Sequence, residues 1–366
     1  MPILYHSVDP ESNRSTFTEH NTVSFVINSD RNLVRNSIRL EGKLQVNTTA
    51  GQRASIADGI SMNKRVGSHA LLDSCQTQLG GNIIESISQD YARFVNMVES
   101  AQNHSDSYYN SAQLCELKAP STSVAIGYCA GDTDNTNAGD AANDIDFSFK
   151  PLICLNRMSG DLQLSKYNNE VRLNFNLARQ VNVLSGAAQV DATNYSISDL
   201  RLTYSSADPE PVGQVQMRRV IPIKQVISTS NASVNTRVPG VCDSVSISFL
   251  NQAQENQNKF DTLALQNPLN IEEVGFTFND STNALQQYTQ DEYSEYVEGY
   301  IKSLKTAGIH GANPNSIGGN SVFGLGLDFT SDVDLSNQKF GVSVRSGINA
   351  AYKFVVYLYF HSKMVV

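Results

Sequence analysis

The side chains that most often bind metal ions or act as nucleophiles are scattered through this sequence. No two of the six histidines lie within four residues of each other, so neither an H-x-H nor an H-E-x-x-H zinc motif is present. The five cysteines are odd in number and include no C-x-x-C pair, which argues against a disulfide framework or a zinc site. The same cysteine pattern favours free, reduced thiols in a protein made in a reducing compartment. The residues are His6, His20, His69, His104, His310 and His361, and Cys75, Cys115, Cys129, Cys154 and Cys242.

The most polar stretch of the chain, Gly131–Asp144, carries carboxylates that could bind calcium. Its spacing fails the EF-hand pattern, because Asn137 stands where the calcium loop needs glycine. We therefore favour a solvated loop, which is too long for a hairpin turn and projects from the surface. The acidic residues are Asp132, Asp134, Asp140 and Asp144.

Other patterns that could support catalysis or ligand binding are also weak. No G-x-S-x-G nucleophile motif is present, and neither Gly80-Gly81 nor Gly318-Gly319 is followed by the Lys and Ser/Thr of a phosphate-binding loop. The adjacent Glu272 and Glu273 would point to opposite faces of a strand. The tyrosines Tyr293, Tyr296 and Tyr300 could form a carbohydrate platform, but their helical spacing favours packing. We expect no catalytic, cofactor-binding or metal-binding residues, no cofactor, and no enzyme activity.

The composition describes an acidic chain of 366 residues with a net charge of −9, long enough for two domains. This charge argues against broad binding to nucleic acid or anionic membranes. The one local basic group, Arg218, Arg219 and Lys224, is better explained as a solvated strand face. Residues 1–10 lack the features of a secretory signal, and no apolar run is long enough to predict a transmembrane helix.

The elements that must position these residues occur twice in the same order. Each half has alternating strands, one amphipathic helix, a polar loop and closing strands. Ser37–Val46 alternates apolar and polar residues, as in an antiparallel sheet with one buried face. The final run, Tyr352–Phe360, is apolar on both faces apart from Lys353, which predicts a central or doubly covered strand. The closing strands are expected at Asp144–Pro151, Glu170–Ala178 and Tyr195–Tyr204, and at Val322–Phe329, Lys339–Arg345 and Tyr352–Phe360.

The two helices are predicted from capping boxes followed by apolar stripes. Ser86 and Gln89 would cap a helix over Ser86–Ser100, and Thr289 and Glu292 would cap one over Thr289–Leu304. Gly308 is a suitable stop for the second helix. A phase change near Ser198–Asp199 predicts a β-bulge, and the two prolines of Ser205–Val212 predict a linker.

Several of these segments together resemble a known family. They are FGLGLDFTSDVDLSNQKFGVSVRSG with AYKFVVYLYFHSKMVV, then DIDFSFKPLICLNRMSGDLQL with NNEVRLNFNLA and YSISDLRLTY, and GSHALLDSCQTQLGGNIIESISQDYARFV. The chain resembles the double jelly-roll major capsid proteins of the tectivirus–adenovirus lineage. It is most similar in appearance to those of virophages and polinton-like viruses. The resemblance covers most of the chain from about Asn21 onward.

The resemblance implies an all-β fold with a few helices. It consists of two consecutive eight-stranded antiparallel jelly rolls, each with one flanking amphipathic helix that covers a sheet edge or packs at a seam. We expect an N-terminal arm over 1–21, a first roll over 22–208 and a second over 209–366.

The implied function is that of a major capsid protein whose homotrimers form pseudo-hexagonal capsomers of an icosahedral shell. Its partners would be its own copies, neighbouring capsomers and penton or minor capsid proteins. An internal membrane or the genome would lie on the inner side, without recognition of a specific nucleic-acid sequence. The protein would be made in the host cytoplasm or a virus factory and reside in the virion. The alternative is a double jelly-roll carbohydrate-binding protein or enzyme with a site between the rolls.

Overall fold

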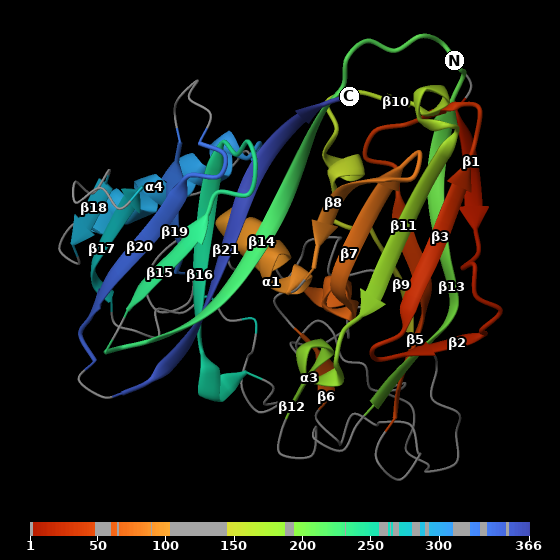
Figure 1. Cartoon of the computed structure of the whole chain (residues 1–366). Helices are drawn as coiled ribbons and strands as arrows, with labels where there is room; N and C mark the ends of the chain where they lie inside the picture. Colours follow the sequence, from red (N-terminus) through yellow and green to blue (C-terminus); the bar gives the residue numbers. More distant parts are fainter. Residues whose placement is uncertain are drawn as a thin grey trace.

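The computed structural model shows two β-rich bodies side by side, with helix α1 (Tyr91–Gln102) between them (Figure 1). Both chain ends lie at the same end of the molecule (Figure 1). The structure describes residues 3–47, 60–63, 66–88, 90–102, 145–186, 194–230, 232–255, 263, 265, 271–279, 286–289, 293–309, 323–329, 335–348 and 351–366.

The first body contains two antiparallel sheets. In one, the order is β10–β4–β13–β5–β9, and β1 and β2 also pair with β13. In the other, the order is β3–β11–β7–β8, and a short ladder of β12 and β6 lies apart from both sheets. The strands are β1 (Leu4–Val8), β2 (Thr16–Thr18), β3 (Thr22–Asn28), β4 (Asn32–Leu33), β5 (Arg39–Asn47), β6 (Ile60–Met62), β7 (Leu72–Leu79), β8 (Asn82–Ile87), β9 (Ile145–Phe149), β10 (Leu162–Gln163), β11 (Glu170–Leu177), β12 (Leu184–Gly186) and β13 (Asn194–Ala207).

The second body contains two antiparallel sheets of four strands each, in the orders β14–β21–β16–β19 and β15–β20–β17–β18. Its strands are β14 (Gln216–Ser228), β15 (Ser233–Arg237), β16 (Ser244–Asn251), β17 (Ile271–Phe278), β18 (Gln286–Thr289), β19 (Leu325–Asp328), β20 (Lys339–Ser346) and β21 (Lys353–Val365). Among the described residues, the helices besides α1 are α3 (Gln180–Val183) and α4 (Tyr293–Thr306), with 3-10 turns η2 (Gly67–Leu71), η3 (Cys154–Arg157), η4 (Leu164–Tyr167) and η6 (Gln252–Gln254).

Both bodies have the same topology. In the second, the first, eighth, third and sixth strands form one sheet, and the second, seventh, fourth and fifth form the other. The first body repeats this order when β1 and β2 together count as its first strand and the short β4, β6, β10 and β12 are set aside. In both, the long helix falls between the fifth and sixth strands. This is the jelly-roll arrangement, so the predicted fold class of two jelly rolls is confirmed.

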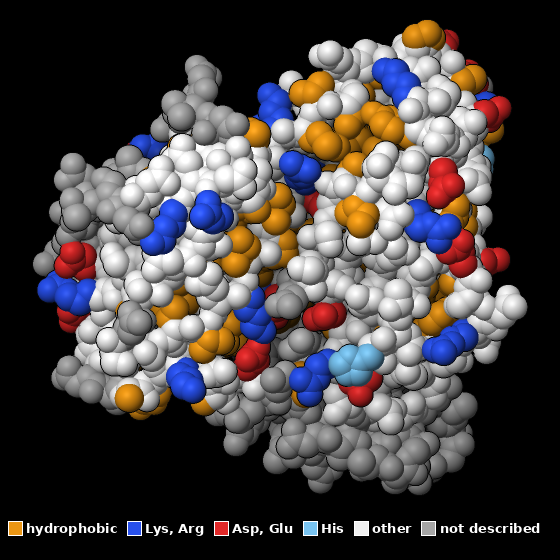
Figure 2. Space-filling model, viewed as in Figure 1, with side chains coloured by type: hydrophobic (Ala, Val, Ile, Leu, Met, Phe, Trp, Pro, Cys, Tyr) orange, Lys and Arg blue, Asp and Glu red, His pale blue; other side chains and the backbone are white. Residues whose placement is uncertain are grey.

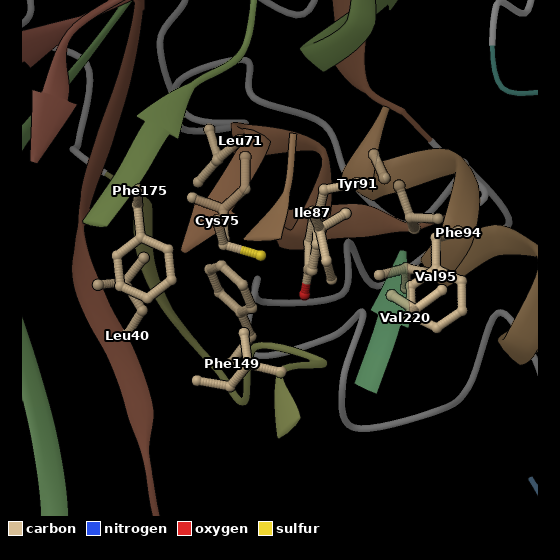
Figure 3. Packing of buried hydrophobic residues seen from close by; sticks show 14 of the residues in the cluster. Leu40, Leu71, Cys75, Ile87, Tyr91, Phe94, Val95, Phe149, Phe175 and Val220 are labelled. Carbon is tan, nitrogen blue, oxygen red and sulfur yellow. The ribbon is translucent and has the colours of Figure 1, made fainter. Parts of the chain in front are cut away.

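The buried residues form two clusters. One fills the space between the sheets of the second roll, and the other fills the first roll and continues beyond it. Figure 3 shows this continuation, from Phe149 and Phe175 inside the first roll, through Ile87 and Phe94, to Val220 of β14 in the second roll. The two rolls therefore share one hydrophobic core at their junction.

The N-terminal residues differ from the predicted arm. Leu4–Val8 pairs with β13 from Ser206 to Leu202, and Thr16–Thr18 pairs with the same strand further along. The segment looks aperiodic in sequence because it is an edge strand in two short pieces whose side chains are mostly exposed. Among the eight residues of β1 and β2, Phe17 alone is fully buried, and Val8 packs partly against the core. The division into 22–208 and 209–366 stays a prediction, although the described strands of the first roll end at Ala207.

Both predicted capping boxes are wrong in the part that the structure describes. Ser86 lies inside β8, and Thr289 is the last residue of β18; Gln89 and Glu292 lie outside the described residues. Helix α1 begins after Asp90, whose positive φ of 53° turns the chain from strand to helix. The backbone N–H groups of Arg93 and Phe94 both donate to the Asp90 carbonyl. The residues predicted to begin the two helices therefore belong to the preceding strands, β8 and β18, and the helices begin later along the chain.

Other local predictions are confirmed. The register of β13 against β5 shifts between Ser198 and Arg201, and Asp199 has a φ of 50°, as expected for a bulge. Gly308 ends α4 with a φ of 79°. There the N–H of Ile309 bonds to the Leu304 carbonyl and that of Gly308 to Lys305, which closes the helix end.

Candidate functional site: the seam between the jelly rolls

The last strand, β21, is apolar on both faces because each face packs on a different core. Phe354, Val356, Leu358 and Phe360 point into the second roll, whereas Val355, Tyr357 and Tyr359 point outward into the seam. The strand lies between β14 and β16, so its edges are paired as well. The prediction of a central strand covered on both sides is therefore confirmed. The outer face of this sheet forms the second roll's half of the seam.

Helix α1 of the first roll packs on that outer face. The Phe94 ring is 1% exposed, and its centroid lies 5.4 Å from that of Tyr359. The Arg93 guanidinium lies 4.5 Å from the ring centroid of Tyr357, in a cation–π contact. The Tyr359 hydroxyl donates to the Asp90 carbonyl over 3.2 Å. Aromatic rings of β21 thus hold the helix of the other roll.

Helix α4 of the second roll covers the adjoining part of the same face. The Tyr300 hydroxyl donates to the Met97 carbonyl of α1 over 3.3 Å, and this side chain is fully buried. Gly324 and Gly326 permit the close approach of α4, since a Cβ on Gly324 would lie 2.7 Å from the Tyr300 ring. Tyr300 is thus a packing residue, as its spacing predicted. The side chains of Tyr293 and Tyr296 lie outside the description.

A buried carboxylate also joins the two rolls at the seam. Glu85 of β8 accepts hydrogen bonds from the backbone N–H groups of Cys154 (2.6 Å) and Val220 (2.9 Å), and Arg157 Nη2 donates to it over 2.9 Å. Burial raises the pKa of Glu85, while Arg157 and the two N–H groups oppose that rise. Because Val220 belongs to β14, this carboxylate binds both rolls at once. No sequence motif indicates this role of Glu85. The signal available was a charged residue on the inward face of β8, in phase with the buried Ile87.

A second polar group lies at the start of α1. Lys224 of β14 bonds to Glu255 and lies 3.7 Å from an Asp90 carboxylate oxygen. Burial raises the pKa of Asp90, and the charges of Arg93 and Lys224 oppose this. Burial alone would lower the pKa of Lys224, but Asp90 and the Glu255 bond raise it above its usual value. These contacts hold the second roll's strand against the first roll's helix.

The three basic residues of β14 do not form one patch. Lys224 is held by Asp90 and Glu255, Arg218 pairs with Asp243 at 3.1 Å, and Arg219 donates to the Ser362 hydroxyl over 3.2 Å. Each side chain serves the packing of the second roll or the seam. The three residues therefore form neither a basic binding surface nor the fully solvated strand face that we expected.

The buried histidines are structural. His69 bonds to the Tyr91 hydroxyl, and His361 bonds to the Ser246 hydroxyl, each over 2.9 Å. Burial lowers the pKa of both imidazoles to about 3, so they are neutral at ordinary pH. His6, by contrast, stacks on Tyr204 at the surface of the first roll.

No metal centre is assembled within the described ranges, where no three His, Cys, Asp or Glu side chains come together. Cys75, Cys154 and Cys242 are free and buried. The remaining candidates, Cys115, Cys129, His104, His310, Gly318-Gly319 and the acidic loop Asp132 to Asp144, lie outside the described residues. None of the helices that the structure describes has the length and hydropathy needed to cross a bilayer.

The adjacent Glu272 and Glu273 do not point to opposite faces as expected. Their carboxylates lie 3.6 and 3.4 Å from Arg345 Nε, so both face the same cation. The register of β17 against β20 shifts between Ile271 and Glu273, and this irregularity turns Glu272 towards Arg345. The two half-buried glutamates thus form an ion cluster with the exposed Arg345.

Apolar side chains of both rolls pack together along the seam. Figure 2 shows hydrophobic side chains gathered along the line where the two rolls meet. A cavity of about 790 Å³ lies elsewhere, on the outer face of β5, β9 and β13 in the first roll. It is lined by Asp9, Arg39, Glu41, Gly42, Lys43, Asp146, Phe147, Ser148, Asp199, Leu200 and Arg201. The lining mixes both charges, and within it the Ser148 hydroxyl donates to Glu41 over 3.4 Å and accepts from Arg39 Nε over 2.9 Å.

Two jelly rolls fused through a shared core define the double jelly-roll class of fold. No protein-family model and no curated protein sequence matches the chain. Solved structures do match over the whole chain. The PBCV-1 protein VP54, fitted into a cryo-EM reconstruction of the virophage Sputnik, is similar with a TM-score of 0.60 and 13% identity, covering 100% of this chain and 95% of that one.

Two virophage structures are similar in the same way. A chain of the Sputnik virophage has a TM-score of 0.58 and 10% identity, over 100% of this chain and 88% of its own. The mavirus major capsid protein has a TM-score of 0.53 and 9% identity, over 99% of this chain and 90% of its own. The chain therefore has the fold of these capsid proteins, and the predicted resemblance is confirmed at the level of the fold.

Proposed function

We propose that this chain is a major capsid protein and not an enzyme, and that its homotrimers are the pseudo-hexagonal capsomers of an icosahedral viral shell. The observation that carries the proposal is the seam, where α1, β14 and β21 join two jelly rolls into one unit with a shared core. Three such units supply six similar rolls, which suit a near-hexagonal lattice. The match in fold over whole capsid chains supports the same function.

The partners follow from this role. Each trimer would contact neighbouring capsomers and penton or minor capsid proteins, with an internal membrane or the genome on its inner side. The protein would be made in the host cytoplasm or a virus factory and reside in the virion. Contacts within the trimer would be heterologous and closed by a three-fold axis. No observation favours the alternative of a carbohydrate-binding protein or enzyme with a site between the rolls, because apolar side chains fill that junction.

Light scattering coupled to size-exclusion chromatography tests the proposal on the purified full chain. The expected result is a particle with three times the mass of the 40.0 kDa chain, or larger assemblies of it. A stable monomer at high protein concentration, with no assembly under any salt or pH condition, would contradict it.

A further inference from the structure

Strand β1 forms an open edge of the first roll. It pairs with β13 on one side, and no described strand pairs with it on the other. In Figure 1 it lies on the side of the first roll away from the second roll. Ile3, Leu4 and Tyr5 are 51%, 43% and 85% exposed. The strand Leu4–Val8 has no charged residue, no proline and no register shift, which are the usual protections of an exposed edge.

The hydrogen bonds of β13 show which groups of β1 point outward. The Ser205 carbonyl accepts from the Val34 N–H over 3.0 Å, and the Ser205 N–H donates to Ser37 Oγ over 3.2 Å. Both groups of Ser205 therefore point away from β1. Tyr5 lies opposite Ser205, so its own N–H and carbonyl point away from β13, as do those of Ser7, two residues on. Among the residues that the structure describes, no backbone group bonds to these two.

The equivalent edge of the second roll, on β14, is protected within the chain. The Val220 N–H donates to Glu85, and the Gln216 N–H donates to Ser159 Oγ over 3.0 Å. Pro222 shares this alternation and has no N–H to offer. Donors of the β14 edge are thus bonded or absent, whereas those of β1 are open to another strand.

We infer that β1 pairs antiparallel with β1 of a second copy, around a two-fold axis at His6, and that this pairing joins neighbouring capsomers. In this register Tyr5 of each copy lies opposite Ser7 of the other, and each of these pairs exchanges two N–H···O bonds. Both outward-pointing residues of the strand are therefore used. The register also places the apolar Leu4 against the apolar Val8.

The symmetry places this contact between trimers. Pairing of identical strands around a two-fold axis is isologous, whereas the contacts of a three-fold ring are heterologous. The pairing therefore rests on the proposed capsid function and adds to it the way in which trimers join. Because β1 has no Asp, Glu, Lys or Arg, two copies meet without repulsion between like charges.

A proline on the open edge tests the pairing. Ser7→Pro removes an outward N–H from each copy and leaves the ladder to β13 intact, so the chain should still fold. It should weaken association between trimers roughly tenfold or more, because each contact loses two hydrogen bonds and the proline ring occupies the edge. The matched control is Ser7→Ala, which removes the same hydroxyl but keeps the N–H and should associate like the wild type. Sedimentation velocity over a dilution series measures association, and circular dichroism checks folding.

A disulfide trap tests the register. At the two-fold axis, position 6 of one copy faces position 6 of the other as a non-hydrogen-bonded pair, with Cα atoms about 4.5 Å apart. That distance suits a disulfide, so His6→Cys should crosslink two copies under mild oxidation. In Ser7→Cys the substituted positions are displaced by two residues along the strands, about 7 Å, and should not crosslink. Peptide mapping by mass spectrometry locates the bond.

The outcomes separate this pairing from the proposed function. A crosslink at position 6, together with trimers of Ser7→Pro that no longer associate, supports the pairing. Wild-type trimers that form no crosslink at position 6, and that associate no better than those of Ser7→Pro, would overturn it and leave the capsid proposal intact. The same result is expected if the edge of β1 binds a different protein instead of a second copy. A wild-type chain that stays monomeric would refute the capsid proposal, and the pairing with it.

Discussion

Replacement of Phe94 by alanine should destabilise the whole protein, because this ring lies in the core that the two rolls share. The side chain is 1% exposed, and its ring lies 5.4 Å from the Tyr359 centroid and 5.4 Å from the Arg157 guanidinium carbon. Truncation of a buried phenylalanine to alanine costs about 3–5 kcal/mol. Two ring interactions are lost as well, so we expect a value of about 4 kcal/mol. That is a large part of the ~5–15 kcal/mol that usually separates folded from unfolded states.

Urea unfolding followed by far-ultraviolet circular dichroism measures this loss, and hydrogen exchange locates it. Phe94→Ala should speed exchange in α1 and also in β21, which belongs to the other roll. The matched control is Phe276→Ala, which removes an equally buried ring from the interior of the second roll. It should cost a similar free energy but speed exchange mainly in β17 and β20. A Phe94→Ala cost below about 1 kcal/mol, or faster exchange confined to the first roll, would refute the idea of a shared core.

Three further results are expected. A chain that ends before Lys353 should lose the cooperative unfolding of the second roll, because β21 is the central strand of its sheet; a truncated chain that still melts cooperatively would contradict this. Burial lowers the pKa of His361 to about 3, below its ordinary value of 6.5. The folded state therefore binds this proton more weakly than the unfolded state does. The contribution is complete above pH 6.5 and is lost as the pH falls towards 3, by about 1.4 kcal/mol per pH unit. His361→Gln should flatten that part of the stability profile measured by urea titration between pH 7 and pH 5, and an unchanged slope would count against it. Gly326→Ala should cost about 1–3 kcal/mol, because the added Cβ would overlap the Ser303 side chain and approach Tyr300 Cα to 2.9 Å; an unaltered melting temperature would show that α4 can move aside.

Alternation was enough to predict the strands with one buried face and one wet face. In β5, every second residue from Leu40 to Val46 is buried, as the sequence pattern indicates. The doubly apolar β21 was also predictable as a central strand, because no solvent-exposed strand keeps such residues on both faces. These elements are determined by burial, and burial leaves a periodic signal in the sequence.

The features that the sequence did not reveal depend on contacts distant along the chain. The strands β1 and β2 are short and exposed, and their partner β13 lies almost 200 residues away. The role of Glu85 depends on N–H groups of Cys154 and Val220, which lie 69 and 135 residues further along the chain. The sequence around Glu85 cannot show which distant strand supplies the N–H groups that its buried carboxylate accepts. For the same reason the seam emerged from the structure and not from the search for catalytic motifs.

Cryo-electron microscopy of the purified protein tests most directly whether this chain builds a trimer of six jelly rolls. We expect particles with three-fold symmetry and a near-hexagonal outline, each composed of six similar β-rich bodies, either alone or within shells. Single two-lobed particles at every protein concentration, with no three-fold class and no shells, would contradict it.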